Sequence, residues 1–463
     1  MISSMRSHAY LHRAILVKGM IITALILVNV FVAFVAGKGM VMRPKVMLLG
    51  LGVLTAGVAI YCLECGILGL VLTAAAVPFS LSTGTQSQVP ASMIVAGLLI
   101  GVWSVTMIIR QDFGFKLAGA NLPLLGFVAA STFSLIWSNA FRPLDIRVWP
   151  SFPLVQLGGL AIILLSAGSF LLVGNVLRAL GWVKRLWVLF VTVAVVGIFQ
   201  ELAKIRPIPL NTPGLFPMWV VSLAYGQVLF NYHLSRWQRL LLVILTAAWV
   251  YRVFFLGITW ISGWLPSVVA ILALSFLKSK RLFLLLLVLL MVYVALDYDF
   301  YYQRVWVYSL HEDASRLAAW QRNWEVTKDH LLFGTGPAGY AVYYMTYFPT
   351  KAMASHSNYV DLLSQTGIVG FFFFSWFLVS LCKSGFDTQR RLKSGTFASA
   401  LGKSLFCGCL AVLLAMFLGD WLLPFVYTGG LAGFDHSIHS WILLGVMVAL
   451  GDIERPPAKL EAR

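Results

Sequence analysis

Long runs of apolar residues limit the folds open to this chain more than any other feature. Runs such as Ile21–Ala36, Leu154–Leu177 and Leu282–Leu296 are close to the length that an α-helix needs to cross a bilayer. Only 11% of the 463 residues are charged, whereas 60% are hydrophobic, which leaves too little charge for a soluble surface. The sequence therefore predicts an all-α polytopic membrane protein with about 12–14 transmembrane helices.

The distribution of lysine and arginine indicates the orientation of these helices. Basic residues concentrate in four short loops, at 178–185, 236–239, 278–281 and 383–403. The positive-inside rule places these loops and both termini in the cytoplasm. The net charge of +17 then reflects topology and contact with anionic membrane lipid, and nucleic acid is not an expected partner. When the spans are counted in order, a basic cluster at 38–45 lies on the external side of the membrane, against the positive-inside rule. The topology of the first three helices is therefore the least determined.

One long hydrophilic stretch, 297–365, interrupts the apolar pattern. It carries five Lys and Arg against seven Asp and Glu. The orientation rule places it outside the membrane, and a long ordered loop between spans usually carries function. We therefore expect an N-terminal helical bundle over 1–296, a large, mostly helical external (periplasmic) catalytic loop over 297–365, C-terminal membrane helices over 366–451 and a cytoplasmic tail over 452–463.

The loop contains one histidine in a chemically useful position. A helix is expected over Ser315–Val326, with Arg316 in its first turn. A second helix is expected to be capped by Ser355 or Ser357, which places His356 at its N-terminus. The positive end of the helix dipole disfavours a protonated imidazole, so this histidine can act as a general base. The same helix end offers free N–H groups to an anion such as a pyrophosphate.

Three motifs in this region resemble the O-antigen ligase/O-antigen polymerase superfamily of membrane glycosyltransferases. They are Arg316-x-x-x-Trp320, Leu332-Phe-Gly334-x-Gly336-Pro337 and His356-x-x-Tyr359-x-x-Leu362-Leu363-x-x-x-Gly367. By that resemblance His356 matches the family's essential histidine, and Arg316 matches an arginine that holds the lipid diphosphate. The chain departs from the family pattern at Ser357, at Gln365 and in Thr259–Gly263, which lacks an expected arginine.

The resemblance implies a metal-independent, inverting transfer without a cofactor in a bacterial cytoplasmic membrane. The donor is a glycan on undecaprenyl diphosphate, and the acceptor is another glycan or a lipid. His356 and Arg316 are the expected catalytic residues. Further candidates for contact with the lipid diphosphate or the glycan are Arg252, Arg304, Asn358, Tyr359 and Arg206. We favour a polymerase, with an O-antigen ligase as the alternative.

Each candidate also has a purely structural interpretation. His356 could only cap a helix, Arg316 could be an ordinary surface charge, and Arg252 and Arg206 could contact lipid headgroups. Asp297-x-Asp299 has a form that can share a cation, but its aromatic surroundings are typical of a span end, so no metal site is expected. Cys62 and Cys65 are interpreted as small buried apolar residues. A flippase or transporter for the same lipid-linked sugar, or a non-catalytic scaffold, remains open as another class of function.

Overall fold

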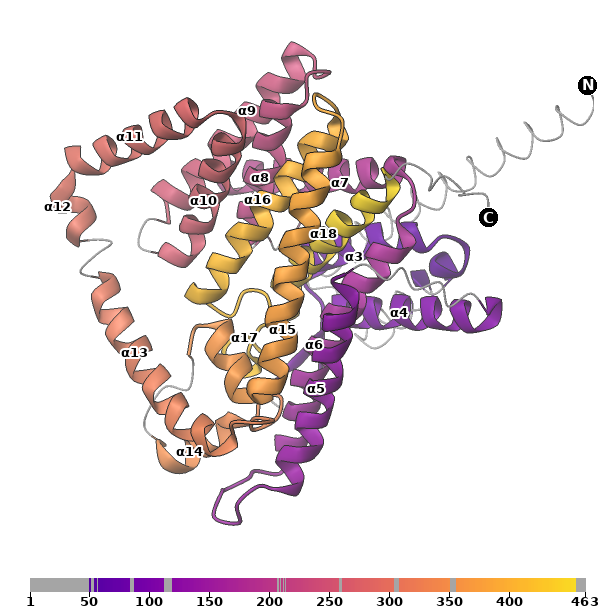
Figure 1. Cartoon of the computed structure of the whole chain (residues 1–463), viewed down its shortest axis with the longest axis vertical. Helices are drawn as coiled ribbons and strands as arrows, with labels where there is room; N and C mark the ends of the chain where they lie inside the picture. The colour runs from indigo at the N-terminus through magenta and orange to yellow at the C-terminus, as the bar shows by residue number, and fades with distance from the viewer. Residues whose placement is uncertain are drawn as a thin grey trace, which may run out of the picture. The chain divides into compact units, whose positions relative to one another are not determined.

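The computed structural model describes residues 50–454, except for 51–53, 56, 84–86, 112–118, 206–207, 209, 211, 213, 258–259, 304–307 and 350–354. The described chain is almost entirely helical, which confirms the predicted all-α class (Figure 1). It divides into two compact units, Met1–Gly114 with Phe199–Asn211, and Phe115–Ile198 with Thr212–Arg463. Arg304 and Arg206, two of the predicted ligand-binding residues, lie outside the described residues.

The first unit contains two packed helices joined by a short hairpin. Its elements are α3 (Leu63–Ala76), β1 (Ser80–Ser82), β2 (Gln88–Pro90) and α4 (Ala91–Arg110). The strands are antiparallel, with Ser80 opposite Pro90. Gly66 lets α3 approach α4 closely, because a Cβ at this position would collide with the side chain of Leu99. Small residues at such contacts let helices pack where the hydrophobic effect gives no net drive.

The second unit holds the remaining elements. They are α5 (Asn121–Ala140), α6 (Phe152–Val176), α7 (Leu180–Ala203, of which the part up to Ile198 lies in this unit), α8 (Phe216–Phe230), α9 (Arg236–Val250), the π-helical turn η1 (Tyr251–Phe255), α10 (Ile261–Lys278), α11 (Lys280–Leu296), α12 (Tyr298–Tyr301), α13 (Tyr308–Thr327), the 3-10 turn η3 (Lys328–His330), α14 (Tyr340–Tyr347), α15 (Asn358–Arg391), α16 (Phe397–Leu418), α17 (Val426–Gly429) and α18 (Gly433–Ile453).

Nine helices in the described part of the chain are long and apolar enough to cross a membrane. They are α4, α5, α6, α7, α9 with η1, α10, α15, α16 and α18. The helices α3 and α8 are apolar but shorter. The chain is therefore a multi-pass membrane protein, as its apolar runs predict. The predicted helix over 315–326 is also present, within the longer α13.

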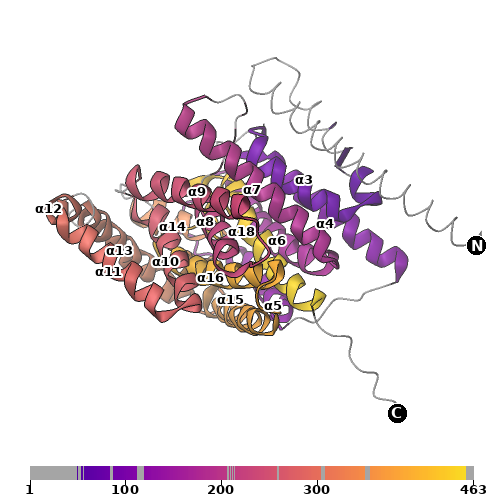
Figure 2. The same cartoon turned by 90° about the horizontal axis from the view of Figure 1, so that it is seen from above.

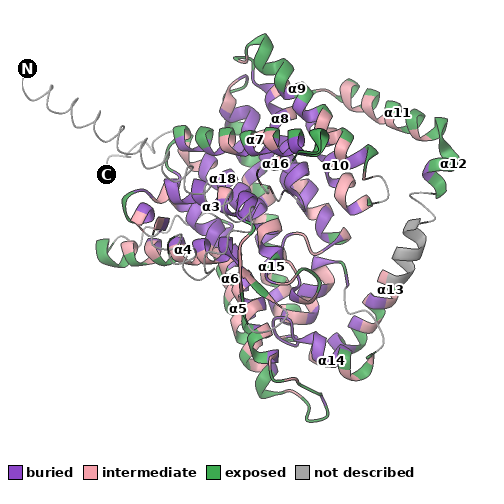
Figure 3. Cartoon of the chain, turned by 180° about the vertical axis from the view of Figure 1, so that it is seen from behind, coloured by how far each residue is buried: buried purple, intermediate pink, exposed green. Residues whose placement is uncertain are grey.

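The centre of the second unit is formed by α6, α15 and α18. Most of α18 is buried (Figure 3), and it runs along α6 in the view from above (Figure 2). A Cβ on Gly445 of α18 would lie 2.8 Å from the carbonyl oxygen of Phe170 in α6, so glycine permits this close approach. The ring of Phe377 from α15 stacks on Trp441 at 5.9 Å and meets Phe170 edge-on at 5.3 Å. These aromatic contacts join the three helices into one core.

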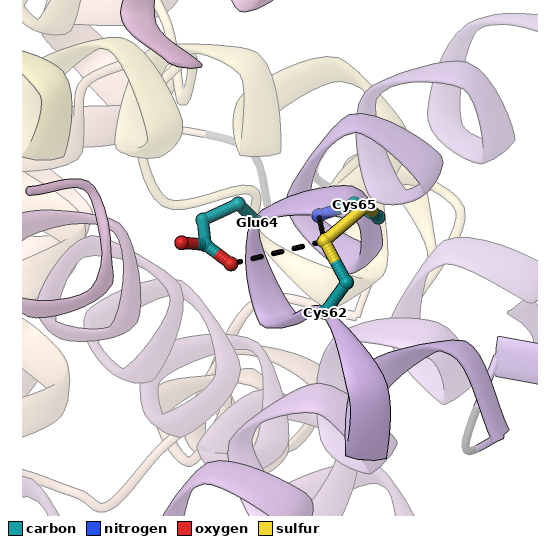
Figure 4. Close-up of a disulfide and its surroundings, with 3 residues drawn as sticks. All are labelled: Cys62, Glu64 and Cys65. Atoms are coloured by element: carbon teal, nitrogen blue, oxygen red, sulfur yellow. Dashed lines mark hydrogen bonds between the residues drawn. A yellow bond between two sulfur atoms is a disulfide. The ribbon is translucent and has the colours of Figure 1, made fainter. Parts of the chain in front are cut away.

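Cys62 and Cys65 are bonded to each other, which corrects the interpretation of the pair as independent apolar residues. Both are buried, as expected, but a disulfide joins them at the start of α3 (Figure 4). Residues three apart at a helix start lie on one side, which brings the two sulfur atoms together. The backbone N–H of Cys65 points at Cys62 Sγ at 3.2 Å, and a Glu64 carboxylate oxygen lies 3.8 Å from the same sulfur. Cys382, Cys407 and Cys409 are not in disulfides.

Candidate functional site

The helix α15 is broken at Gly367, where φ is 63° and ψ is −170°. The hydroxyl of Tyr359 donates to the carbonyl oxygen of Leu413 at 3.0 Å, and Cys382 Sγ lies 3.9 Å from Cys409 Sγ. A straight helix would separate residues 359 and 382 by ~34 Å, whereas their partners in α16 are only about one turn apart. The chain therefore reverses at Gly367. Residues 358–366 form a short helix, here called the re-entrant helix, that folds back along the span 368–391.

The turn 331–336 holds this reversal in place. A break in a helix leaves carbonyl and N–H groups without their usual partners, which is costly away from water. The turn supplies those partners on both sides of Gly367. The four backbone hydrogen bonds run from Ile368 N–H to Leu331 O (2.8 Å), from Val369 N–H to Leu332 O (3.2 Å), from Thr335 N–H to Ser364 O (3.0 Å) and from Gly336 N–H to Gln365 O (2.9 Å). The side chain of Gln365 adds a fifth contact by accepting from Ala338 N–H at 2.7 Å.

The glycines of the sequence motifs are explained by this contact. Gly334, Gly336 and Gly367 all have positive φ, the region that L-residues with side chains avoid. A Cβ on Gly334 would lie 2.5 Å from the carbonyl of Gln365, and one on Gly367 would collide with the carbonyl of Leu332. Gly334 and the distant Gly367 thus permit the close approach of two backbone segments, whereas Gly336 makes room for the side chains of Ser138 and Gln156.

His356 lies just before the re-entrant helix, as predicted from its serine neighbours. The helix begins at Asn358 with Ser357 as its N-cap, and the His356 side chain is exposed. The φ of His356 is +51°, an uncommon conformation for a residue with a side chain. Such a conformation costs on the order of 1–3 kcal/mol and persists only where the surroundings fix it.

A buried hydrogen-bond network fixes the backbone around His356. The hydroxyl of Ser355 donates to Asp361 Oδ1 at 2.7 Å, and the hydroxyl of Tyr340 donates to the same oxygen at 2.7 Å. The Ser357 N–H donates to Ser355 Oγ at 3.1 Å. Burial raises the pKa of Tyr340 well above its ordinary value, and the neighbouring Asp361 carboxyl raises it further, so the phenol remains a donor.

The helix α13 is attached to the same segment through the motif tryptophan. Trp320 Nε1–H donates to the carbonyl oxygen of Ser355 at 2.7 Å, directly before His356. Arg316 lies four residues earlier in α13, on the same side of the helix as Trp320, and its side chain is half-buried. The Arg-x-x-x-Trp spacing therefore ties the helix that carries Arg316 to the segment that carries His356.

Asn358 and Tyr359 both brace the re-entrant helix. Asn358 is fully buried; its amide nitrogen donates to Leu423 O at 2.6 Å, and its amide oxygen accepts from Leu422 N–H at 2.9 Å. Tyr359 is half-buried, with its ring packed on Phe417 at 5.2 Å and its hydroxyl on α16. A small pocket lies on the buried side of this helix, lined among others by Asn358, Asp361 and Gln365.

Arg252 lies apart in the sequence, within η1 at the end of α9. Its guanidinium carbon is 5.3 Å from the centre of the Trp249 ring, a cation–π contact. A π-helical turn often marks a functional position. An ionisable group within a membrane span is costly and therefore usually has a function. Within the described residues, no group of three or more His, Cys, Asp and Glu side chains is arranged to hold a metal ion.

The sequence does not reveal that the hydroxyls of Ser355 and Tyr340 both donate to Asp361. The signal for Asp361 was an acidic residue beside apolar Leu362 and Leu363, next to a membrane span, where an ionisable group usually has a specific partner.

Residues 240–375 match the family model described as O-antigen ligase. The matched segment contains Arg252, Arg316, His356 and the reversal at Gly367. The comparison with curated proteins gave no match.

Proposed function

We propose that this chain, a multi-pass member of the O-antigen ligase/O-antigen polymerase superfamily, transfers a glycan from undecaprenyl diphosphate to an acceptor hydroxyl. The reaction takes place on the external face of a bacterial cytoplasmic membrane. One observation carries the proposal: His356, with its side chain exposed, lies at the start of the re-entrant helix, in a segment hydrogen-bonded to the helix that bears Arg316.

His356 acts as the general base. In its neutral form the imidazole accepts the proton of the acceptor hydroxyl. The hydroxyl oxygen attacks the anomeric carbon while the bond to the diphosphate oxygen breaks, so the configuration inverts. Negative charge grows on the departing diphosphate, and Arg316 stabilises it with paired N–H groups. No nucleotide sugar is needed, because the lipid diphosphate stores the energy of the transfer. The proposed transfer is also independent of a metal ion.

The depth of the site supports a lipid-linked donor. The start of the re-entrant helix contacts the carbonyls of Leu413 and Met416, which belong to α16, a helix long enough to cross the membrane. The base therefore lies beside the end of a span. The apolar chain of a lipid-linked donor, embedded in the membrane, would hold the diphosphate at this level. Arg252, Arg304 and Arg206 are further candidates for the diphosphate, while Asn358 and Tyr359 support the helix that carries the base.

The acceptor decides between two members of the same class. We favour a polymerase, which adds the glycan to a second lipid-linked glycan. A ligase, which moves the finished glycan onto lipid A core or another acceptor, is the alternative, and the description of the matching family model favours it.

Purified protein with a defined lipid-linked oligosaccharide, without nucleotide sugar and with a chelator, tests the proposal. Longer glycans on the donor lipid would indicate a polymerase, and glycan on an added second lipid would indicate a ligase. His356→Ala should abolish both products, whereas His233→Ala, an exposed histidine far along the chain, should change neither. A His356→Ala protein with full activity in cells would instead point to a flippase or scaffold.

A further inference from the structure

Asp361 is a carboxyl group in an unusual place. It is 2% exposed, and its Oδ1 accepts hydrogen bonds from two neutral hydroxyls, those of Ser355 and Tyr340. Burying a carboxyl group costs several kcal/mol unless its partners compensate, and an apolar residue would fill the same space at lower cost. Buried polar groups of this kind can specify one arrangement of the chain around them.

The arrangement specified here surrounds His356 on both sides. Ser355 precedes the histidine, and its hydroxyl both donates to Asp361 and accepts from Ser357 N–H, the residue that follows. Ser355 and Ser357, the two neighbours of His356 in the sequence, are thereby hydrogen-bonded to each other. This closed contact explains how the +51° φ of His356 is maintained.

The same carboxyl joins three separate segments. Tyr340 comes from α14, Ser355 from the segment before the re-entrant helix, and Asp361 from that helix itself. Because the carbonyl of Ser355 also accepts from Trp320, α13 with Arg316 is attached to the same point.

We propose that Asp361 is the positioning residue of the site, which holds His356 in its left-handed conformation and in register with Arg316. This inference rests on the proposed function for its effect on catalysis. Its geometric part concerns the fold alone. Without the carboxyl, Ser355 rotates freely, His356 relaxes to negative φ, and Trp320 loses a fixed acceptor.

The kinetic consequence is a loss of kcat rather than of donor binding. A displacement of about 1 Å between reacting groups can cost about 100-fold in rate. Asp361→Ala should therefore lower kcat by about 100-fold while the KM for the donor changes by less than about threefold. Asp361→Asn keeps a carbonyl oxygen for both hydroxyls and should retain kcat within about tenfold. Asp329→Ala, which removes an exposed carboxyl of the same loop, should have no effect.

A distance measurement tests the geometry without any need for activity. Spin labels at Arg316→Cys and His356→Cys, with Cys382, Cys407 and Cys409 replaced by Ser, report the separation of the two segments. Asp361→Ala should broaden or shift the distance distribution, and Asp361→Asn and Asp329→Ala should leave it unchanged. If Asp361→Ala does not fold, Ser355→Ala, which removes one of the two donors, should broaden the distribution in its place.

The two measurements separate the two ideas. An unchanged distribution in the variants that lack the contact would overturn the positioning role, whatever the enzyme does. An Asn variant as inactive as the Ala variant would also overturn it, because the charge and not the contact would then matter. A changed distribution in a protein whose wild type transfers no glycan would sink the proposed function and leave the positioning role intact.

Discussion

Replacing Gly367 by alanine should disrupt the site severely, because the residue combines a positive φ with close backbone contacts. The φ of 63° and ψ of −170° at this residue lie in a region that essentially only glycine occupies. The added Cβ would lie 2.5 Å from Phe333 N and from the carbonyl carbon of Leu332, which are backbone atoms that no rotamer change can move. The turn 331–336 must therefore shift as a whole or the reversal must open.

The cost can be estimated from these contacts. The backbone conformation contributes about 1–3 kcal/mol. Loss of the hydrogen bonds from Ile368 N–H and Val369 N–H adds about 1 kcal/mol each. The expected destabilisation of about 3–5 kcal/mol is a large share of the 5–15 kcal/mol typical of a folded domain.

Thermal and denaturant unfolding in detergent, with glycan transfer measured in parallel, provides the assay. Gly367→Ala should unfold at markedly lower denaturant and lose transfer. Gly181→Ala is the matched control, because this exposed glycine of α7 has no atom within 4 Å of an added Cβ, and alanine there should be neutral or slightly stabilising. A Gly367→Ala protein within about 1 kcal/mol of wild type, with transfer retained, would refute the reversal at this residue.

Three further predictions concern other parts of the chain. Arg316→Ala should reduce transfer by about 100-fold, and Arg316→Lys should recover little of it because a single ammonium cannot pair with two phosphate oxygens at once; kcat and KM for the lipid-linked donor check this. Burial lowers the pKa of His330 below 6.5, so the unfolded state takes up the proton first as pH falls. The free energy of unfolding should therefore hold above about pH 7, decrease below about pH 6.5, and show a smaller decrease in His330→Gln. With Cys382, Cys407 and Cys409 replaced by Ser, the denatured protein should take up maleimide only after reduction; uptake beforehand would disprove the Cys62–Cys65 disulfide.

Features set by local pattern were predictable from the sequence. Of the three apolar runs named above, Leu154–Leu177 corresponds to the candidate span α6. Leu282–Leu296 forms α11, which is not among the nine candidate spans, and Ile21–Ala36 lies outside the described residues. The helix expected over Ser315–Val326 lies within α13. The serine pattern correctly placed His356 just before a helix, but the N-cap Ser357 makes no side-chain capping hydrogen bond, and the Ser355 hydroxyl donates to Asp361.

Features set by distant contacts were not predictable in the same way. The residues before Gly367 lead directly into the apolar run that follows it. The sequence pattern therefore predicts one continuous helix through this glycine. The reversal depends on a turn about thirty residues earlier, which supplies the missing backbone partners. The role of Asp361 depends on Tyr340 from another helix, and the bracing by Asn358 depends on the carbonyl and N–H groups at 422–423. No single-residue property reveals such pairings.

Because the turn 331–336 is bonded to the chain on both sides of Gly367, the re-entrant helix cannot hinge at this glycine as an open lid could. Opening the reversal at Gly367 would require four backbone hydrogen bonds to break together. The backbone that bears the imidazole is thus held in place, and both sugars must be delivered to it. Any adjustment to a different glycan therefore belongs to segments outside this clamp.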